Sequence, residues 1–339
     1  MTDPNNFVEI DDVVARTQAL WPKAASMAGL PEAGASFRRL QIRSTKQHCR
    51  SAVKVSTPNG KNYVLRAEFD EYDSARFLQN LERHKAAAEA LKSETGVSVP
   101  AILWQDLENP YLLMEFAAGD TAFRELVLTE YGFGDRQAVV QRIGKAVAAL
   151  HRVSEIGEKQ FWPKPYLDRV SEQAQALRAK HLRIPKPNRF LGLCAYLQRA
   201  GRDARGHRYT AAIEHGDLHL RNILVSDATV SFIDFSNSKG ALPQRDLANI
   251  WLANCPDHLA KEGQEPGYGL VAKADWDAFE EGYGAGITGD PVFRFFFALR
   301  LFKIWLLFTG KSHLLDKKDT KIIEALVQVY LSLVADEPG

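Results

Sequence analysis

The hydrophobic period of this sequence changes near residue 119, and this change constrains the fold more than any other feature. Between residues 37 and 67, three stretches alternate apolar and polar residues as β-strands do, and Asn59-Gly60 supplies a tight turn between the last two. A helical pattern over 74–96 is followed by two more short strand patterns, and from 120 onward helical patterns dominate. The sequence therefore predicts an α+β fold. We expect a small five-stranded antiparallel part with one main helix, followed by a mostly helical part.

The chain of 339 residues is long enough for two compact units. We expect an N-terminal helix over 8–29 and a small lobe within 1–117, and a larger helical lobe over 118–339. The very apolar segment 292–310 carries three cations, which are costly in a bilayer but which a helix against a protein core can turn outward. It is therefore interpreted as a core helix.

Overall composition excludes several classes of protein. With 43 basic and 42 acidic residues, the net charge of +1 does not indicate a nucleic-acid binder. The three cysteines lie far apart without a Cys-x-x-Cys pair, so they indicate neither a disulfide framework nor a zinc site. The N-terminus shows no signal-peptide pattern, so a cytoplasmic location without a membrane span is the default expectation.

Two short stretches carry the candidate chemistry: His215 to Leu224, "HGDLHLRNIL", and Val230 to Ser238, "VSFIDFSNS". A carboxylate between apolar strand residues, as at Asp234, normally has a binding partner. Phosphoryl transfer from ATP requires oxygen ligands for Mg²⁺ and a group that orients or deprotonates the acceptor hydroxyl. Asp217 suits the second role, and Asn222 and Asp234 suit the first.

The two stretches resemble the catalytic loop and the metal-binding Asp-Phe of protein-kinase-like enzymes. The form His-Gly-Asp and the later "RDLAN" are similar to the aminoglycoside phosphotransferase and choline kinase branch. The resemblance implies a two-lobed kinase-like fold, catalytic Asp217, and Asn222 and Asp234 as metal ligands. It places His219 where protein kinases have a phosphate-touching lysine, and it makes His215 a stabiliser of the loop.

The resemblance also assigns residues of the small lobe. The family has a nucleotide-binding lysine in its third strand, and "YVLRAEF" offers Arg66 there, with Lys54 in the preceding strand as a second candidate. Arginine keeps the charge but differs in geometry. Glu82 is the preferred helix partner for this cation, with Glu89 as an alternative and His84 near the expected position.

Three further positions follow from the same resemblance. The nucleotide-covering loop lacks glycine, so Ser44, Thr45 and main-chain N–H groups are its candidate phosphate contacts, or the loop is an ordinary polar one. "LLMEFAAGD" resembles the hinge between lobes, where the C=O of Glu115 and the N–H of Ala117 would read the adenine edge. Asp246 in "QRDLAN" matches an aspartate that anchors the catalytic loop.

The acceptor is the least constrained part of the function. Residues 178–208 contain nine cations and one acid, which disfavours a polycationic antibiotic and favours an anionic acceptor such as an acidic sugar or a saccharide. A solvated basic surface is the alternative. We therefore expect an ATP- and Mg²⁺-dependent phosphotransferase that acts on a small-molecule hydroxyl. A kinase of a macromolecular acceptor and a non-catalytic nucleotide-binding pseudokinase are the competing hypotheses, and the oligomeric state is open.

Overall fold

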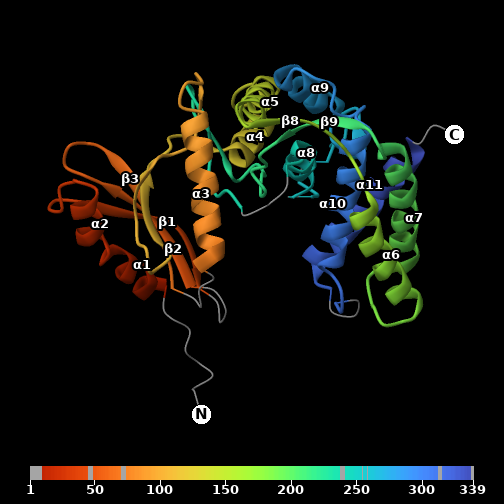
Figure 1. Ribbon diagram of the computed structural model, residues 1–339, viewed down its shortest axis with the longest axis horizontal. Coiled ribbons are helices and arrows are strands. Elements are labelled where there is room, and N and C mark those ends of the chain that lie inside the picture. The colour runs from red at the N-terminus through yellow and green to blue at the C-terminus, as the bar shows by residue number, and fades with distance from the viewer. Residues whose placement is uncertain are drawn as a thin grey trace, which may run out of the picture. The chain divides into compact units, whose positions relative to one another are not determined.

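The computed structural model describes residues 10–44, 49–69, 74–236, 241–253, 255–257, 259–311 and 315–336. It confirms the expected α+β class, with a five-stranded antiparallel sheet and a mainly helical remainder (Figure 1). The chain forms two compact units, of which the first takes described residues within Met1–Ser93, Ser98–Gly119 and Ser231–Asn237, and the second takes the rest. The assignment of nucleotide binding to 1–117 and acceptor binding to 118–339 stays a prediction.

The first unit is built on one antiparallel sheet with the strand order β1-β2-β3-β6-β5. At the turn between β2 and β3, Gly60 has a φ of +78°, the left-handed region that glycine enters without strain, as the Asn-Gly pair predicts. The strands are β1 (Ser36–Ser44), β2 (Cys49–Ser56), β3 (Asn62–Glu68), β5 (Ile102–Gln105) and β6 (Tyr111–Glu115).

Buried and partly buried residues alternate along β3, so they lie on opposite faces of the sheet. Tyr63 and Leu65 are buried in a core cluster with Trp21, whereas Arg66 between the buried positions is only partly buried. Because successive strand residues point to opposite faces, Arg66 lies on the face away from that cluster. The hydrophobic pattern thus sets the face on which the candidate nucleotide cation lies.

The N-terminal helix expected over 8–29 is two helices, α1 (Ile10–Gln18) and α2 (Trp21–Met27), and residues 8 and 9 lie outside the described part. Pro22 lies in the first turn of α2. A proline has no N–H to donate to the preceding turn, so it starts a helix readily but does not continue one. The expectation of a single helix was wrong at this break.

The second unit is mainly helical. Helices α5 and α9 approach closely because Gly144 and Gly282 face the partner backbone: a Cβ at Gly144 would lie 2.3 Å from the C=O oxygen of Phe279. In Figure 1 the green and blue helices α6, α7, α10 and α11 gather in one group. The helices are α4 (Ala122–Glu130), α5 (Arg136–Val153), α6 (Lys164–Arg178), α7 (Pro187–Ala204), α8 (Pro243–Leu252), α9 (Lys273–Tyr283), α10 (Pro291–Leu306) and α11 (Lys317–Ala335), with a short 3₁₀ helix, η1 (Tyr268–Leu270).

The apolar segment near the C-terminus is helix α10, and its aromatic and aliphatic residues are buried, which confirms its interpretation as a core helix. Among the described residues, no helix is long and apolar enough to span a membrane.

Short strands frame the polar loop that follows β9. β9 (Arg208–Ala212) pairs with β8 (Glu155–Gln160), and β10 (Ile223–Val225) pairs with β7 (Asp120–Thr121). The chain crosses between the two units within β4 (Val97–Ser98) and β11 (Val230–Phe232), and the main helix of the first unit is α3 (Ser74–Ala90). The loop between β9 and β10 therefore belongs to the second unit, and the residues just after β11 belong to the first.

Candidate active site

The candidate catalytic residues lie on the loop between β9 and β10. The side chains of His215, Leu218 and Leu220 are fully buried. Asp217, which lies among them, keeps 53 % of its side chain exposed. The buried neighbours hold the backbone and leave the carboxylate accessible.

Helix α8 fixes this loop through two side chains. Asp246 accepts hydrogen bonds from the backbone N–H groups of His215 and Gly216, with N···O distances of 2.6 and 3.0 Å. Asn249 donates from Nδ2 to the C=O of Leu218 over 2.9 Å. A spacing of three residues puts both side chains on one helix face, so both reach the loop. The anchoring role that the resemblance implies for Asp246 is confirmed.

Asp246 is a buried charge with several partners. Desolvation by burial disfavours its ionised form, but the hydrogen bond and charge of His151 and the donors at His215 outweigh it and lower the pKa of Asp246 below 3.8. His151 Nε2 lies 3.5 Å from the carboxylate, and its Nδ1 lies 3.0 Å from the Tyr283 hydroxyl. Asp246 therefore stays ionised at neutral pH and holds the loop as a charged acceptor.

His219 lies beside the candidate base. Its Nδ1 accepts the backbone N–H of Arg221 over 3.2 Å, so hydrogen bonding assigns the proton of the neutral ring to Nε2. Nε2 lies 3.8 Å from Oδ2 of Asp217, close enough for electrostatic interaction but long for a hydrogen bond. Asn222 donates from Nδ2 to the C=O of Asp217 over 3.0 Å, which leaves its Oδ1 as an acceptor. The loop thus holds a carboxylate, a ring N–H and an amide oxygen.

Asp234 and Arg66 form an ion pair within the first unit. Asp234 follows β11 with a φ of +59°, a left-handed conformation that aspartate tolerates better than most residues. A second carboxylate, Glu68, lies 2.7 Å from Nη2 of Arg66. Desolvation opposes the charge of Arg66, but attraction to Asp234 and Glu68 raises its pKa. The structure therefore brings the candidate nucleotide cation to one candidate metal ligand.

Glu82 does not pair with Arg66. Its side chain is 72 % exposed and lies 3.6 Å from the amine of Lys85. Two residues further along α3, about 200° around the helix, His84 is buried and makes a 2.6 Å hydrogen-bond contact with the C=O of Pro100. Desolvation lowers the pKa of His84, and the charges of Asp234 and Arg66 also act on it. Glu68 of β3, and not Glu82 of the helix, is thus the glutamate that contacts Arg66.

Of the loop residues, Ser44 is the last residue of β1, opposite Cys49 in the β1–β2 register, and Thr45 lies outside the described residues. Lys54, the second candidate for the nucleotide cation, has its ammonium 4.4 Å from the centre of the Phe116 ring. Arg66, and not Lys54, is therefore the cation paired with Asp234. The nucleotide contacts of Ser44 and Thr45 stay predictions.

The expected hinge follows the end of β6. Glu115 is the last residue of that strand, and its N–H donates to the C=O of Ala101 over 2.9 Å. Ala117 lies two residues further on and is half-buried. The adenine-reading roles of these two residues stay predictions.

The candidate metal ligands have suitable donor chemistry. Asn222 offers a carboxamide oxygen and Asp234 a carboxylate, both of them hard donors of the kind that Mg²⁺ prefers. Within the described ranges, no group of three or more His, Cys, Asp and Glu side chains is placed to hold a metal.

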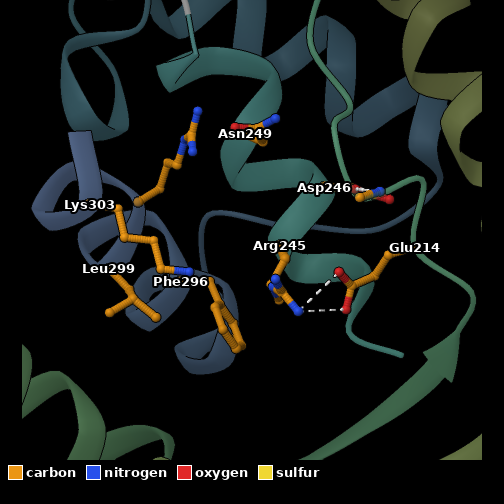
Figure 2. Close-up of a pocket in the computed structure, with 9 residues that line it drawn as sticks. Glu214, Arg245, Asp246, Asn249, Phe296, Leu299 and Lys303 are labelled. Carbon is orange, nitrogen blue, oxygen red and sulfur yellow. Dashed lines mark hydrogen bonds and ion pairs between the residues drawn. The ribbon is translucent and has the colours of Figure 1, made fainter. Parts of the chain in front are cut away.

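A cavity of about 60 Å³ opens beside Gly216 in the second unit. In Figure 2, Arg245 contacts Glu214 on one side, and Phe296, Leu299 and Lys303 of α10 lie on the other. Nη1 of Arg245 is 3.2 Å from a carboxylate oxygen of Glu214, and the other oxygen accepts the N–H of Leu242 over 2.9 Å. The cavity is lined by Glu214, Gly216, Arg245, Asp246, Asn249, Phe296, Leu299, Arg300 and Lys303.

Several of these residues were not identified from the sequence. Asn249 was accessible in principle, because it follows Asp246 at the spacing of one helix face. Glu214 directly precedes the loop that begins at His215, and no sequence motif identified it as a functional residue. Arg300 and Lys303 lie about eighty residues beyond Asp217, and only the tertiary structure brings their helix to the catalytic loop.

Comparison with known proteins identifies the family of the chain. A family model described as "Phosphotransferase enzyme family" matches residues 40–281, more than two thirds of the chain. The match includes both stretches singled out in the sequence. The chain belongs to this family of phosphotransferases, and the predicted enzyme class is confirmed. No curated protein sequence matches the chain.

Solved structures confirm the protein-kinase-like fold. A choline/ethanolamine kinase family protein from Mesorhizobium loti superposes with a TM-score of 0.58 at 14% identity, covering 96% of each chain. Ethanolamine kinase from Plasmodium vivax gives 0.56 at 16% identity, covering 97% of this chain and 92% of that one. Amicoumacin kinase in complex with AMP-PNP, Ca²⁺ and Ami gives 0.56 at 14% identity and 97% of each chain.

Proposed function

We propose that this protein transfers the γ-phosphoryl group of ATP to a hydroxyl group of a small molecule, with Mg²⁺ as the metal. The observation that carries the proposal is the exposed Asp217 carboxylate on a loop that Asp246 and Asn249 fix by backbone hydrogen bonds. Membership of the phosphotransferase family supports it.

In this mechanism Asp217 accepts the proton of the acceptor hydroxyl. The hydroxyl oxygen forms a bond to the γ-phosphorus while the bond to the β–γ bridging oxygen breaks, and ADP leaves. His219, with its proton on Nε2, donates to the transferred phosphoryl group. Bound Mg²⁺, held by Asn222 and Asp234, would neutralise charge on the phosphate oxygens.

The nucleotide half of the site belongs to the first unit. Arg66 offers a planar guanidinium that can bind phosphate oxygens in bidentate fashion. Glu68 holds one of its nitrogens, so the side chain keeps its direction when the nucleotide binds. The contacts proposed for Ser44, Thr45, Glu115 and Ala117 complete this half.

An anionic acceptor belongs to the proposal, but the basic segment 178–208 does not support it. Most of its cations are exposed. Arg208 pairs with Glu158, and Arg205 lies 5.4 Å from the centre of the Trp162 ring. None of the nine lines the cavity beside Gly216. The segment fits the alternative of a solvated basic surface, and support for an anion comes from the cavity itself.

The test is Asp217→Asn in an ATP-consumption screen over sugars, amino alcohols, nucleosides, phosphosugars and hydroxy acids. We expect the variant to fold and bind ATP with Mg²⁺ but to lose transfer by about 10²- to 10⁴-fold, the usual contribution of a positioned base. Asp227→Asn, an exposed position on the turn after β10, is the matched control. Unchanged turnover in Asp217→Asn would contradict the proposal.

A second variant addresses the nucleotide site. Asp234→Ala should lose the Mg²⁺-dependent part of ATP binding, measured by titration with and without the metal, because a hard oxygen ligand is removed. Phosphorylation of a macromolecule but of no metabolite would instead favour a macromolecular acceptor. ATP binding without transfer to any acceptor would favour a pseudokinase.

A further inference from the structure

Helix α10 turns a cation into the protein beside the catalytic loop. The sequence allowed its cations to point outward, yet Arg300 lines the cavity beside Gly216, is partly buried, and has its Nε buried without a hydrogen-bond partner. An unpaired buried guanidinium nitrogen is unfavourable, since a buried charged group needs both a counter-charge and hydrogen bonds. The cavity therefore contains a donor that the fold itself does not satisfy.

Lys303 follows Arg300 by one helical turn and lines the same cavity. Desolvation and the like charges of Arg245, Arg300 and Arg169 lower the pKa of its amine to about 8, although Glu214 acts in the opposite direction. Desolvation also lowers the pKa of Arg300. The cations of this site therefore repel one another.

The acids that line the cavity are already bound. Glu214 accepts the Leu242 N–H and pairs with Arg245, and Asp246 accepts two backbone N–H groups of the catalytic loop. Within the part of the chain that the structure describes, neither Arg300 nor Lys303 forms an ion pair with a carboxylate. The acids that line the cavity are therefore not available to Arg300, and Lys303 lies one helical turn away with its side chain exposed.

We propose that this cavity binds an anionic group of the acceptor, a phosphate or a carboxylate, through Arg300 and Lys303. The proposal rests on the proposed function, because it identifies the acceptor class of that same site. Arg245, which Glu214 already holds, is a positioning residue at the rim.

Size and position support this assignment. A volume of about 60 Å³ corresponds to roughly four or five water positions, enough for a phosphate or carboxylate group but not for a whole sugar. The remainder of the acceptor must extend out of the cavity. Gly216 lines the cavity and is bonded to Asp217, and the charge of Asp217 acts on Arg300. An acceptor anchored by its anion would thus present a neighbouring hydroxyl to the candidate base.

The experiment compares matched neutral, amino, carboxylate and phosphate forms of hydroxyl compounds in the wild type, Arg300→Met and Lys303→Met. Methionine keeps the apolar chain and removes the charge. We expect the wild type to prefer one of the two anionic forms, which separates phosphate from carboxylate. Each variant should raise the KM for that form about ten- to a hundredfold, the usual range for a charge-assisted hydrogen bond, with the KM for ATP unchanged. Arg202→Met, an exposed cation in the basic segment, is the control.

Binding of inorganic phosphate, measured by calorimetry at two salt concentrations, gives a readout independent of turnover. We expect wild-type binding that weakens at least tenfold in Arg300→Met and in Lys303→Met but not in Arg202→Met. Equal phosphate binding in all variants, or a wild-type preference for neutral or amino acceptors, would overturn the inference while leaving the proposed function intact. Failure of the proposed function would give a different result, because the turnover of Asp217→Asn would then equal that of the wild type. If Arg300→Met does not fold, Lys303→Met alone carries the test.

Discussion

Asp246→Asn tests whether α8 sets the geometry of the catalytic loop. The carboxylate accepts the N–H groups of His215 and Gly216, and asparagine keeps only one acceptor oxygen and places an NH₂ against the second donor. One charge-assisted hydrogen bond is lost, worth about 1.5–3 kcal/mol, and the other becomes neutral, at a cost of about 1 kcal/mol. We expect the free energy of unfolding to fall by about 3 kcal/mol.

The same substitution should reduce kcat more than it changes the KM for ATP. A displacement of the loop by about 1 Å moves Asp217 from the acceptor and can reduce turnover about a hundredfold. Arg66, the proposed nucleotide cation, pairs with Asp234 within the other unit, and this ion pair does not involve Asp246. Urea unfolding followed by circular dichroism, and steady-state kinetics with the acceptor found in the screen, measure the two effects.

The pH dependence of stability distinguishes the loss of the charged Asp246 acceptor from a nonspecific destabilisation of the fold. The pKa of Asp246 is lowered in the folded state below 3.8. A lowered carboxyl pKa contributes stability that is fully present above the unfolded pKa and is lost as the pH falls through the folded pKa. The difference between wild type and Asp246→Asn should therefore be constant from pH 5 to 7 and shrink below about pH 4.

Asp168→Asn is the matched control, because Asp168 is exposed and pairs with Lys164 on α6. Such a surface pair contributes about 0.5 kcal/mol or less, so this variant should unfold almost as the wild type does. A loss in Asp246→Asn no larger than in the control, or a difference from wild type that stays constant down to pH 3, would refute the anchoring argument.

Two further predictions concern charged side chains of the two units. Glu68→Gln should weaken ATP binding several-fold, measured by calorimetry, because Arg66 loses an ion-pair partner that orients it. Glu82→Gln should leave ATP binding unchanged. Weaker binding in Glu82→Gln but not in Glu68→Gln would show that the helix glutamate orients Arg66. The KM for an anionic acceptor should rise as the pH increases through about 8, where Lys303 loses its proton. Lys303→Arg should make the KM less dependent on pH. A wild-type KM that is independent of pH from 7 to 9 would contradict this prediction.

Much of this architecture could be predicted because its signals are local. The Asn-Gly turn and the alternating strands around it fix the hairpin β2–β3 and therefore the face on which Arg66 lies. Asp217 and Asn222 lie five residues apart on one loop, so their contact needs no long-range packing. The family resemblance then extends these local patterns to a kinase-like fold, which the solved structures confirm.

The sequence does not fix which residue of helix α3 faces Arg66. Each residue along a helix turns its side chain by about 100°, so an uncertainty of one or two positions in the phase of α3 exchanges Glu82 for His84. Glu68, in contrast, lies two residues from Arg66 on the same strand and hence on the same face. The nearer acid forms the ion pair because strand geometry already brings it there.

The cations of α10 were harder still to place, and the reason bears on function. An amphipathic helix reveals its buried side through its period, but α10 is apolar nearly all round and is buried on most sides. Nothing in its sequence therefore says which way Arg300 points. The structure turns it toward Gly216, where its unpaired Nε costs folding energy that an apolar residue would not. A residue that lowers stability at the edge of a catalytic loop has a physical explanation if an anionic substrate completes its hydrogen bonds.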